Sequence, residues 1–180
     1  MATRHDDFLQ RGARVFGLSA DTPPMNSAVM ETLALPFPIL SDPDRSRAIG
    51  PLGFADEGDP RSIALSGAVV VTPEGEIAHS VVGRDYADRP DEDELLEVVE
   101  GLGLGPVAQG TFDPGEPGPG EKAVALEDIA PYFRGVKFSV LALRRRHREL
   151  GPEFAEDTKR YVQMVERYLE AMPAVEERRA

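Results

Sequence analysis

Apolar residues gather in short runs over the first half of the chain, with helical patterns between them. Residues 14–19 and 37–40 form apolar runs as long as a buried strand and shorter than an ordinary helix. Between them, an Asp-Thr-Pro-Pro start precedes Met25, Val29 and Leu33, which share one helical face. The order strand, helix, strand predicts a crossover connection and therefore two parallel strands.

A β-hairpin is the clearest local pattern. The apolar runs 68–71 and 77–82 flank a Thr-Pro-Glu-Gly turn. In this turn Pro73 sets the first turn position and Gly75 accepts a positive φ. We therefore expect the two runs to pair as neighbouring strands.

Helices are predicted on either side of these strands. Residues 4–11 have the pattern of the last turns of a helix that Gly12 ends. A second helix begins after an Asp-Arg-Pro-Asp sequence and ends at Gly103. Its apolar stripe consists of Leu95, Val98, Val99 and Leu102. Residues 1–102 are therefore expected to form one α/β domain.

The remaining chain differs in composition. Residues 103–122 are rich in Gly and Pro with little to bury, which is typical of a linker. Two helical patterns follow, one from residue 129 or 131 to 150 and one from about residue 152 to 172. A Gly-Pro pair separates them, so residues 123–180 are predicted to be a helical tail folded as a hairpin.

Composition narrows the class of partner. The chain has 180 residues, a formal net charge of −12 and a sequence pI near 4.7. Nucleic-acid binding is not expected, because it needs basic surface to displace counterions from phosphates. No apolar run approaches the length that spans a bilayer, and the start is charged, so we expect a cytoplasmic protein.

The chain contains no cysteine. This excludes disulfides, thiolate metal sites, iron–sulfur clusters and thiol redox chemistry within these residues. His5, His79 and His147 lie far apart in sequence, and none has a second histidine at ligand spacing. No metal, no cofactor and no catalytic residue is predicted.

Three segments in consecutive order carry a family resemblance. They are residues 12–21 (GARVFGLSAD), 35–44 (LPFPILSDPD) and 69–77 (VVVTPEGEI). From about residue 8 to 102 the chain resembles the alkyl hydroperoxide reductase and thiol-specific antioxidant branch of the peroxiredoxins. The resemblance implies a thioredoxin-like fold and peroxide reduction by a cysteine at the start of a helix. There the helix N-terminus and a nearby arginine favour the thiolate that attacks the peroxide.

The chain departs from the family pattern at the positions that matter for this chemistry. The family cysteine belongs to a Pro-x-x-x-Thr-x-x-Cys motif, which has no counterpart here. The family arginine, often preceded by proline, precedes the strand that matches residues 68–71, where this chain has Leu65 and Ser66. Arg61 lies a few residues upstream and is a candidate anion contact, the alternative being a solvated loop arginine.

The resemblance also implies a missing central strand. In the family that strand and the start of its helix lie before the segment where this chain begins, and the strand lies between those matching residues 15–19 and 68–71. The fold expected is therefore a thioredoxin-like mixed sheet that lacks its first strand and helix, with a C-terminal helical hairpin. The loss of this central strand would leave one open edge on each of the two strands beside it. Three arrangements would cover these edges. The two parts of the sheet could pair directly, or a second copy or another protein could supply a strand. The third is that the tail covers the gap, with residues 123–126 as its extended run. A fourth reading is a shortened piece of a longer protein.

One basic cluster remains. Arg144, Arg145, Arg146 and Arg148 come at the end of the first tail helix, where cations oppose the negative end of the helix dipole. The alternative is contact with an anionic partner or a membrane surface, which the net charge of −12 does not favour.

Two main hypotheses of function follow. The first is a peroxiredoxin-like domain that is catalytically silent as this chain and acts through protein association. The second is part of a thiol peroxidase, an oxidoreductase completed by another segment or chain that brings the cysteine. A third is a membrane-surface adaptor that uses the basic tail helix.

Overall fold

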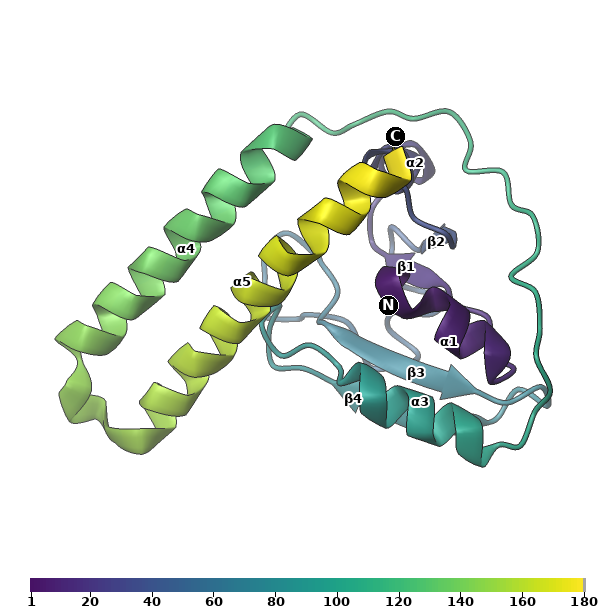
Figure 1. Ribbon diagram of the computed structural model, residues 1–180, viewed down its shortest axis with the longest axis horizontal. Coiled ribbons are helices and arrows are strands. Elements are labelled where there is room, and N and C mark those ends of the chain that lie inside the picture. The colour runs from purple at the N-terminus through teal and green to yellow at the C-terminus, as the bar shows by residue number, and fades with distance from the viewer. Residues whose placement is uncertain (180) are drawn as a thin grey trace. The chain divides into compact units, whose positions relative to one another are not determined.

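The computed structural model describes residues 1–179, and its chain divides into two compact units. The first unit comprises residues 1–121, and the second begins at Lys122. The first combines short strands with helices, and the second is helical (Figure 1). The expected α/β class with a helical C-terminal part is therefore confirmed.

The first unit contains the predicted parallel β-α-β arrangement. β1 (Gly17–Ser19) and β2 (Ile39–Ser41) pair in parallel, and α2 (Pro23–Thr32) connects them. Proline occupies the first turn of α2, where a backbone N–H would have no partner within the helix. Both strands are shorter than their apolar runs, since residues 14–16 and 37–38 lie outside the ladder.

The predicted hairpin is present as an antiparallel pair. β3 (Gly67–Val71) pairs with β4 (Ile77–Val82), and Val69 lies opposite Ser80. Gly75 adopts φ +88°, a value that few other residues tolerate, so this glycine closes the turn. The sequence of the turn thus fixes the pairing of the two strands.

Two helices enclose the core of this unit. They are α1 (His5–Gln10), which follows the short 3₁₀-helix η1 (Ala2–Arg4), and α3 (Glu92–Gly101). The Asp91 side chain caps α3 by accepting a hydrogen bond from the Asp93 backbone N–H at 2.9 Å. α1 and α3 thus match the two helices that flank the strands in the sequence pattern.

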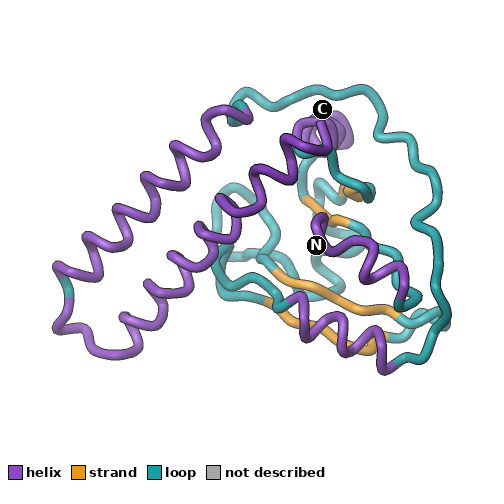
Figure 2. Tube along the Cα trace, in the orientation of Figure 1, coloured by secondary structure: helices purple, strands orange, loops and turns teal. Residues whose placement is uncertain are grey.

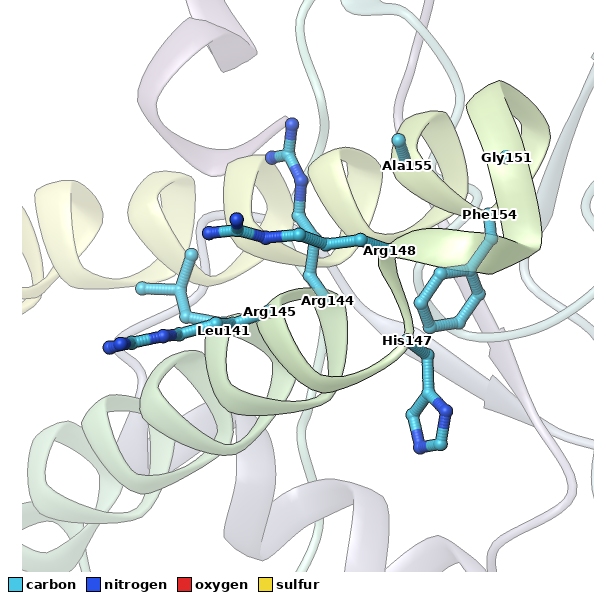
Figure 3. Close-up of a pocket in the computed structure, with 8 residues that line it drawn as sticks. All are labelled: Leu141, Arg144, Arg145, His147, Arg148, Gly151, Phe154 and Ala155. Carbon is cyan, nitrogen blue, oxygen red and sulfur yellow. The ribbon is translucent and has the colours of Figure 1, made fainter.

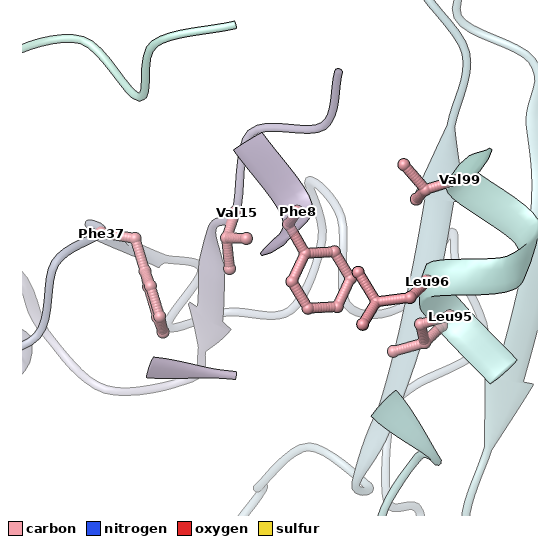
Figure 4. Packing of buried hydrophobic residues seen from close by; sticks show 6 residues of the cluster. All are labelled: Phe8, Val15, Phe37, Leu95, Leu96 and Val99. Carbon is pink, nitrogen blue, oxygen red and sulfur yellow. The ribbon is translucent and has the colours of Figure 1, made fainter. Parts of the chain in front are cut away.

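The buried core lies between the two strand pairs. Phe8 of α1 is 3% exposed and lies in Figure 4 between residues near the β1–β2 pair and residues of α3. The cluster consists of Phe8, Val15, Phe37, Leu95, Leu96 and Val99. Ala68 and Val70 of β3 pack against it. Side chains of α1 and α3 therefore join the two strand pairs, which share no backbone ladder.

The strands form two separate sheets, with the order β1-β2 in one and β3-β4 in the other. The expected single mixed sheet is thus split at the place where the family fold has a further strand. The two halves do not close directly, because no ladder joins β1 to β3 among residues 1–179. Residues 123–126 form no strand either, since α4 begins at Leu126.

The buried face of α2 differs from the predicted face. Asn26, Ser27 and Met30 are buried, whereas Val29 is 39% exposed. Asn26 donates to the Ser41 hydroxyl at 2.8 Å, and the Ser27 hydroxyl donates to the backbone carbonyl of Gly115 at 2.8 Å. Polar partners on β2 and on the segment after α3 therefore set the orientation of this helix.

The Gly/Pro-rich segment lies against the first unit over much of its length. It has no helix or strand, as the long teal stretch after α3 in Figure 2 shows. Val107 donates its N–H to the Leu9 carbonyl at 2.9 Å, and Gly118 donates to the Pro24 carbonyl at 2.8 Å. The first compact unit accordingly extends to residue 121. The division of this part of the chain into a domain of residues 1–102 and a linker of residues 103–122 stays a prediction from the sequence.

The second unit is a hairpin of two long helices, α4 (Leu126–Arg146) and α5 (Gly151–Arg179), with the 3₁₀-helix η2 (Arg148–Leu150) between them. The rings of Phe133 and Tyr168 stack at 4.6 Å, and Lys137 forms an ion pair with Glu166 at 2.6 Å. α4 is about as long as predicted, but it begins earlier, with Pro131 inside the helix, and it ends earlier, at Arg146. α5 is longer than predicted, because it continues through Pro173.

Candidate functional site

Two unpaired strand edges stand where the family fold would place its reacting segment. β1 pairs with β2 on one edge, and no described strand pairs with its other edge. β3 likewise pairs only with β4 among the described strands. Each edge presents backbone N–H and C=O groups in the spacing of a β-ladder, so each can accept a further strand.

The direction of individual backbone groups follows from the ladder. Gly83 donates its N–H to the Ser66 carbonyl at 2.7 Å, which makes this pair a hydrogen-bonded one. Hydrogen-bonded and non-hydrogen-bonded pairs alternate in an antiparallel ladder. Val69 and Ser80 are therefore a non-hydrogen-bonded pair, with the Val69 N–H directed to the open edge of β3 and the Ser80 N–H to the outer edge of β4.

Leu65 and Ser66 occupy the position just before β3 where the family has proline and arginine. The Leu65 N–H donates to the Phe54 carbonyl at 2.7 Å. The Ser66 hydroxyl is buried and has no hydrogen-bond partner among the described residues. This position therefore offers no cation to stabilise a thiolate or a peroxide oxygen.

Arg61 is held by a carboxylate near it in sequence. Its guanidinium contacts Asp59 at 2.9 Å from Nε and 2.5 Å from Nη2. These hydrogen bonds lower the pKa of Asp59 to about 2 and raise the pKa of Arg61. Anion contact by Arg61 stays a prediction, and it would require an anion to compete with Asp59.

The other candidate cations lie together at the turn between α4 and α5. Arg144, Arg145 and Arg148 line an open pocket of about 450 Å³, shown in Figure 3. The remaining lining residues are Leu141, His147, Gly151, Phe154 and Ala155. Arg146 is exposed on the same turn but does not line the pocket. The structure thus brings three of the four predicted tail arginines together and leaves Arg61 in the other unit.

A carboxylate next to this pocket is already engaged. Glu149 lies 3.2 Å from the Nδ1 atom of His147. The pKa of Glu149 is lowered by its own backbone N–H and by this contact with His147. The His147 ring also lies edge-on to Phe154, with centroids 6.4 Å apart. The pocket therefore has one apolar and aromatic end beside its arginines.

Neither location has the groups of a metal centre. Within residues 1–179, no group of three or more His, Asp or Glu side chains is placed to hold a metal ion. The same residues contain no helix that combines the length and the apolar character needed to cross a bilayer. The groups present are backbone N–H and C=O groups at the two strand edges and arginine guanidinium groups at the α4–α5 turn.

Comparison with known proteins agrees with the fold of the first unit. The sequence model of the AhpC/TSA family matches residues 1–80. A protein of Bacillus subtilis (strain 168) named "Putative peroxiredoxin YkuU" is 31% identical over 125 residues, which cover 64% of this chain and 66% of that protein. These two matches support a peroxiredoxin-like redoxin family for this chain. The resemblance inferred from the three sequence segments is confirmed, as is the thioredoxin-like fold class. The chain spans just under two thirds of the length of this peroxiredoxin.

Sequence reasoning did not identify Gln109, which links the Gly/Pro-rich segment to the start of β1. Its side-chain amide accepts from the Val15 N–H at 3.0 Å and donates to the Val15 carbonyl at 2.7 Å. It also lies 3.0 Å from the Nε2 atom of His5. A polar residue in a Gly/Pro-rich segment gives no periodic signal, so the pattern could not reveal this contact.

Proposed function

We propose that this chain is a peroxiredoxin-like domain that has no peroxidase activity of its own and acts by association through the open edges of β1 and β3. The observation that carries the proposal is the absence of cysteine from all 180 residues. Peroxide reduction of the family type needs a thiolate nucleophile, which no other side chain here replaces. Ser66 at the family's arginine position supports the same reading.

The two strand edges support association as the activity. Unpaired strands with apolar neighbours are templates for pairing with another chain. Ala68 and Val70 of β3 pack on the core, so a strand added beside β3 would continue a face that is already partly buried. A second copy of this chain carries the same two edges. We therefore expect self-association by pairing of strands.

Peroxide consumption tests the catalytic half of the proposal. The purified chain is mixed with hydrogen peroxide or an alkyl hydroperoxide and with dithiothreitol as reductant. Consumption is expected to equal that of buffer with dithiothreitol alone. A rate that rises in proportion to the concentration of the chain would contradict catalytic silence.

Sedimentation at increasing concentration tests the association half, with a pair of matched variants. Val69→Pro removes an N–H at the open edge of β3 and leaves the β3–β4 hydrogen bonds in place. Ser80→Pro makes the same change on the opposite strand, at the outer edge of β4. The wild type and Ser80→Pro are expected to associate as concentration rises, and Val69→Pro to remain smaller. A monomeric wild type at all concentrations, or an equal loss in both variants, would refute pairing through β3.

The similarity to the AhpC/TSA family favours one alternative, a thiol peroxidase completed by a segment that brings the cysteine. The test appends a strand–helix segment with a Pro-x-x-x-Thr-x-x-Cys motif to the N-terminus and repeats the peroxide assay. A rate that is lost when the added cysteine is replaced by serine would favour this alternative. Ser66→Arg in the appended chain should then raise the rate, because it restores the cation at the family's arginine position.

A further inference from the structure

We propose that the pocket at the α4–α5 turn binds an organic phosphate, with its phosphate group on Arg144, Arg145 and Arg148 and its apolar part against Leu141 and Phe154. All of these residues belong to the second unit. The site is separate from the strand edges and does not depend on the association proposed above.

The arginines of the pocket are free of ion pairs within the described chain. The side chains of Arg144, Arg145 and Arg148 make no hydrogen bond or ion pair with any of residues 1–179, and all three are exposed. In the first unit, several arginines do pair with a carboxylate. These are Arg4 with Asp93, Arg11 with Glu100, Arg45 with Glu57 and Arg61 with Asp59. The chain has 32 acidic residues, so unpaired cations on one turn do not reflect a lack of carboxylates.

Stabilisation of the helix end does not by itself account for three arginines in one pocket. A cation in the last turn of a helix gains about 0.3–1 kcal/mol from the dipole. Two like charges about 8 Å apart in water repel by about 0.5 kcal/mol. Three cations held close together therefore lose much of what the dipole supplies. A bound anion would reverse this balance, because it attracts all three.

The shape and lining of the pocket indicate the class of anion. Guanidinium groups donate paired hydrogen bonds that match the oxygens of phosphate. In Figure 3 the side chains of Arg145 and Arg148 extend toward one side of the pocket, and Phe154 and His147 lie at the other end. The volume of about 450 Å³ falls in the range of sites for small organic ligands and far exceeds the space of one inorganic ion. A phosphate attached to an apolar or aromatic group fits both ends.

Such a ligand has two possible sources, a dissolved phosphate ester or the headgroup of an anionic lipid. The face of α4 that carries the pocket residue Leu141 is apolar, since Leu141 is 39% exposed and Phe138, three positions before it, is 70% exposed. A lipid headgroup would bring acyl chains to this face, whereas a dissolved ester would leave it uncovered. The two sources are therefore separable by the form in which the phosphate is offered.

The experiment measures binding of two probes to the full chain at low and at physiological salt. One probe is ATP, followed by titration calorimetry. The other is a vesicle of phosphatidylcholine with phosphatidic acid, followed by co-sedimentation, with pure phosphatidylcholine as its blank. Binding of ATP alone would identify a dissolved ester, and binding of the acidic vesicles alone would identify a headgroup. No binding of either probe would overturn the proposal.

A matched pair of double variants distinguishes binding at the pocket from non-specific attraction to positive charge on the hairpin. Arg145→Gln with Arg148→Gln removes two lining cations, and Arg134→Gln with Arg167→Gln removes two exposed cations of the same hairpin that do not line the pocket. The first variant should weaken binding by about tenfold or more, since one charge-assisted hydrogen bond is typically worth at least that factor. The second should change it by less than about threefold. Equal effects of the two variants would show non-specific attraction and refute the site.

Discussion

Gln109 makes three contacts that hold the Gly/Pro-rich segment against the start of β1, and the variant Gln109→Ala removes all of them. Two of these contacts satisfy the backbone N–H and C=O of Val15, which is 5% exposed. The third is with His5, which is 7% exposed. Truncation therefore leaves buried polar groups without their partners.

The expected cost follows from the number of these hydrogen bonds. A typical intramolecular hydrogen bond contributes about 1 kcal/mol net, and an unsatisfied buried group costs about 1–3 kcal/mol. The variant loses both hydrogen bonds to Val15, whereas water can replace the contact with His5. The free-energy cost of Gln109→Ala is therefore about 2–3 kcal/mol. This corresponds to an opening equilibrium about 30- to 150-fold more favourable, at about 1.4 kcal/mol for each factor of ten.

Amide hydrogen exchange at Val15 measures this opening directly, because its N–H donates to the Gln109 side chain. Exchange should accelerate by the factor above in Gln109→Ala. Thr111→Ala, an exposed position of the same segment, serves as the control and should leave exchange unchanged. Exchange at Val15 that stays within about twofold of the wild type in Gln109→Ala would show that the segment is not held in this way.

Three further changes test particular contacts of the first unit. Arg61→Ala should raise the pKa of Asp59 from about 2 toward 3.8, which a carboxyl NMR titration would show, and an unchanged pKa would exclude the pair. Burial acts to raise the pKa of Asp42, but hydrogen bonds from the backbone N–H groups of residues 47–49 outweigh it and the pKa is lowered. A lowered pKa stabilises the fold above the unfolded value near 3.8 and loses that contribution as pH falls through the folded value. Asp42→Asn should therefore lower the urea midpoint at pH 7 more than at pH 3, whereas equal losses would contradict the role of its charge. Phe8→Ala should cost about 3–5 kcal/mol in urea unfolding, since Phe8 is 3% exposed at the centre of the cluster, and a cost below about 1 kcal/mol would refute that placement.

The parts of the fold that the sequence predicts are those that depend on neighbouring residues. The hairpin follows from Pro73 and Gly75, whose backbone preferences act within four residues of chain. The start of α3 follows from Asp91, which caps its own helix. Such elements can be predicted from the residues next to them, without information on the rest of the fold.

The features that sequence reasoning missed depend on distant partners. The buried face of α2 is set by hydrogen bonds of Asn26 and Ser27 with residues 15 and 88 positions away, and apolar periodicity does not register polar contacts. α5 continues through Pro173, because packing of a long helix can offset one lost backbone hydrogen bond. The candidate pocket was foreseen only as a run of arginines. Its aromatic end is supplied by Phe154 of α5, which the fold of the hairpin brings to the arginines of the turn.

The net charge of −12 does not argue strongly against anion binding at one pocket, because it is a property of the whole chain. Electrostatic interactions at the surface extend over about 8 Å at physiological ionic strength. A ligand in the pocket therefore responds to the charges within that distance, and the lining contributes three arginines and no carboxylate. Glu149, the carboxylate next in sequence to Arg148, keeps its negative charge because its pKa is lowered, so it offsets part of the charge of these arginines and not all of it. The local field can thus be positive on a strongly acidic chain, and binding at this pocket should weaken as added salt shortens the range of that field.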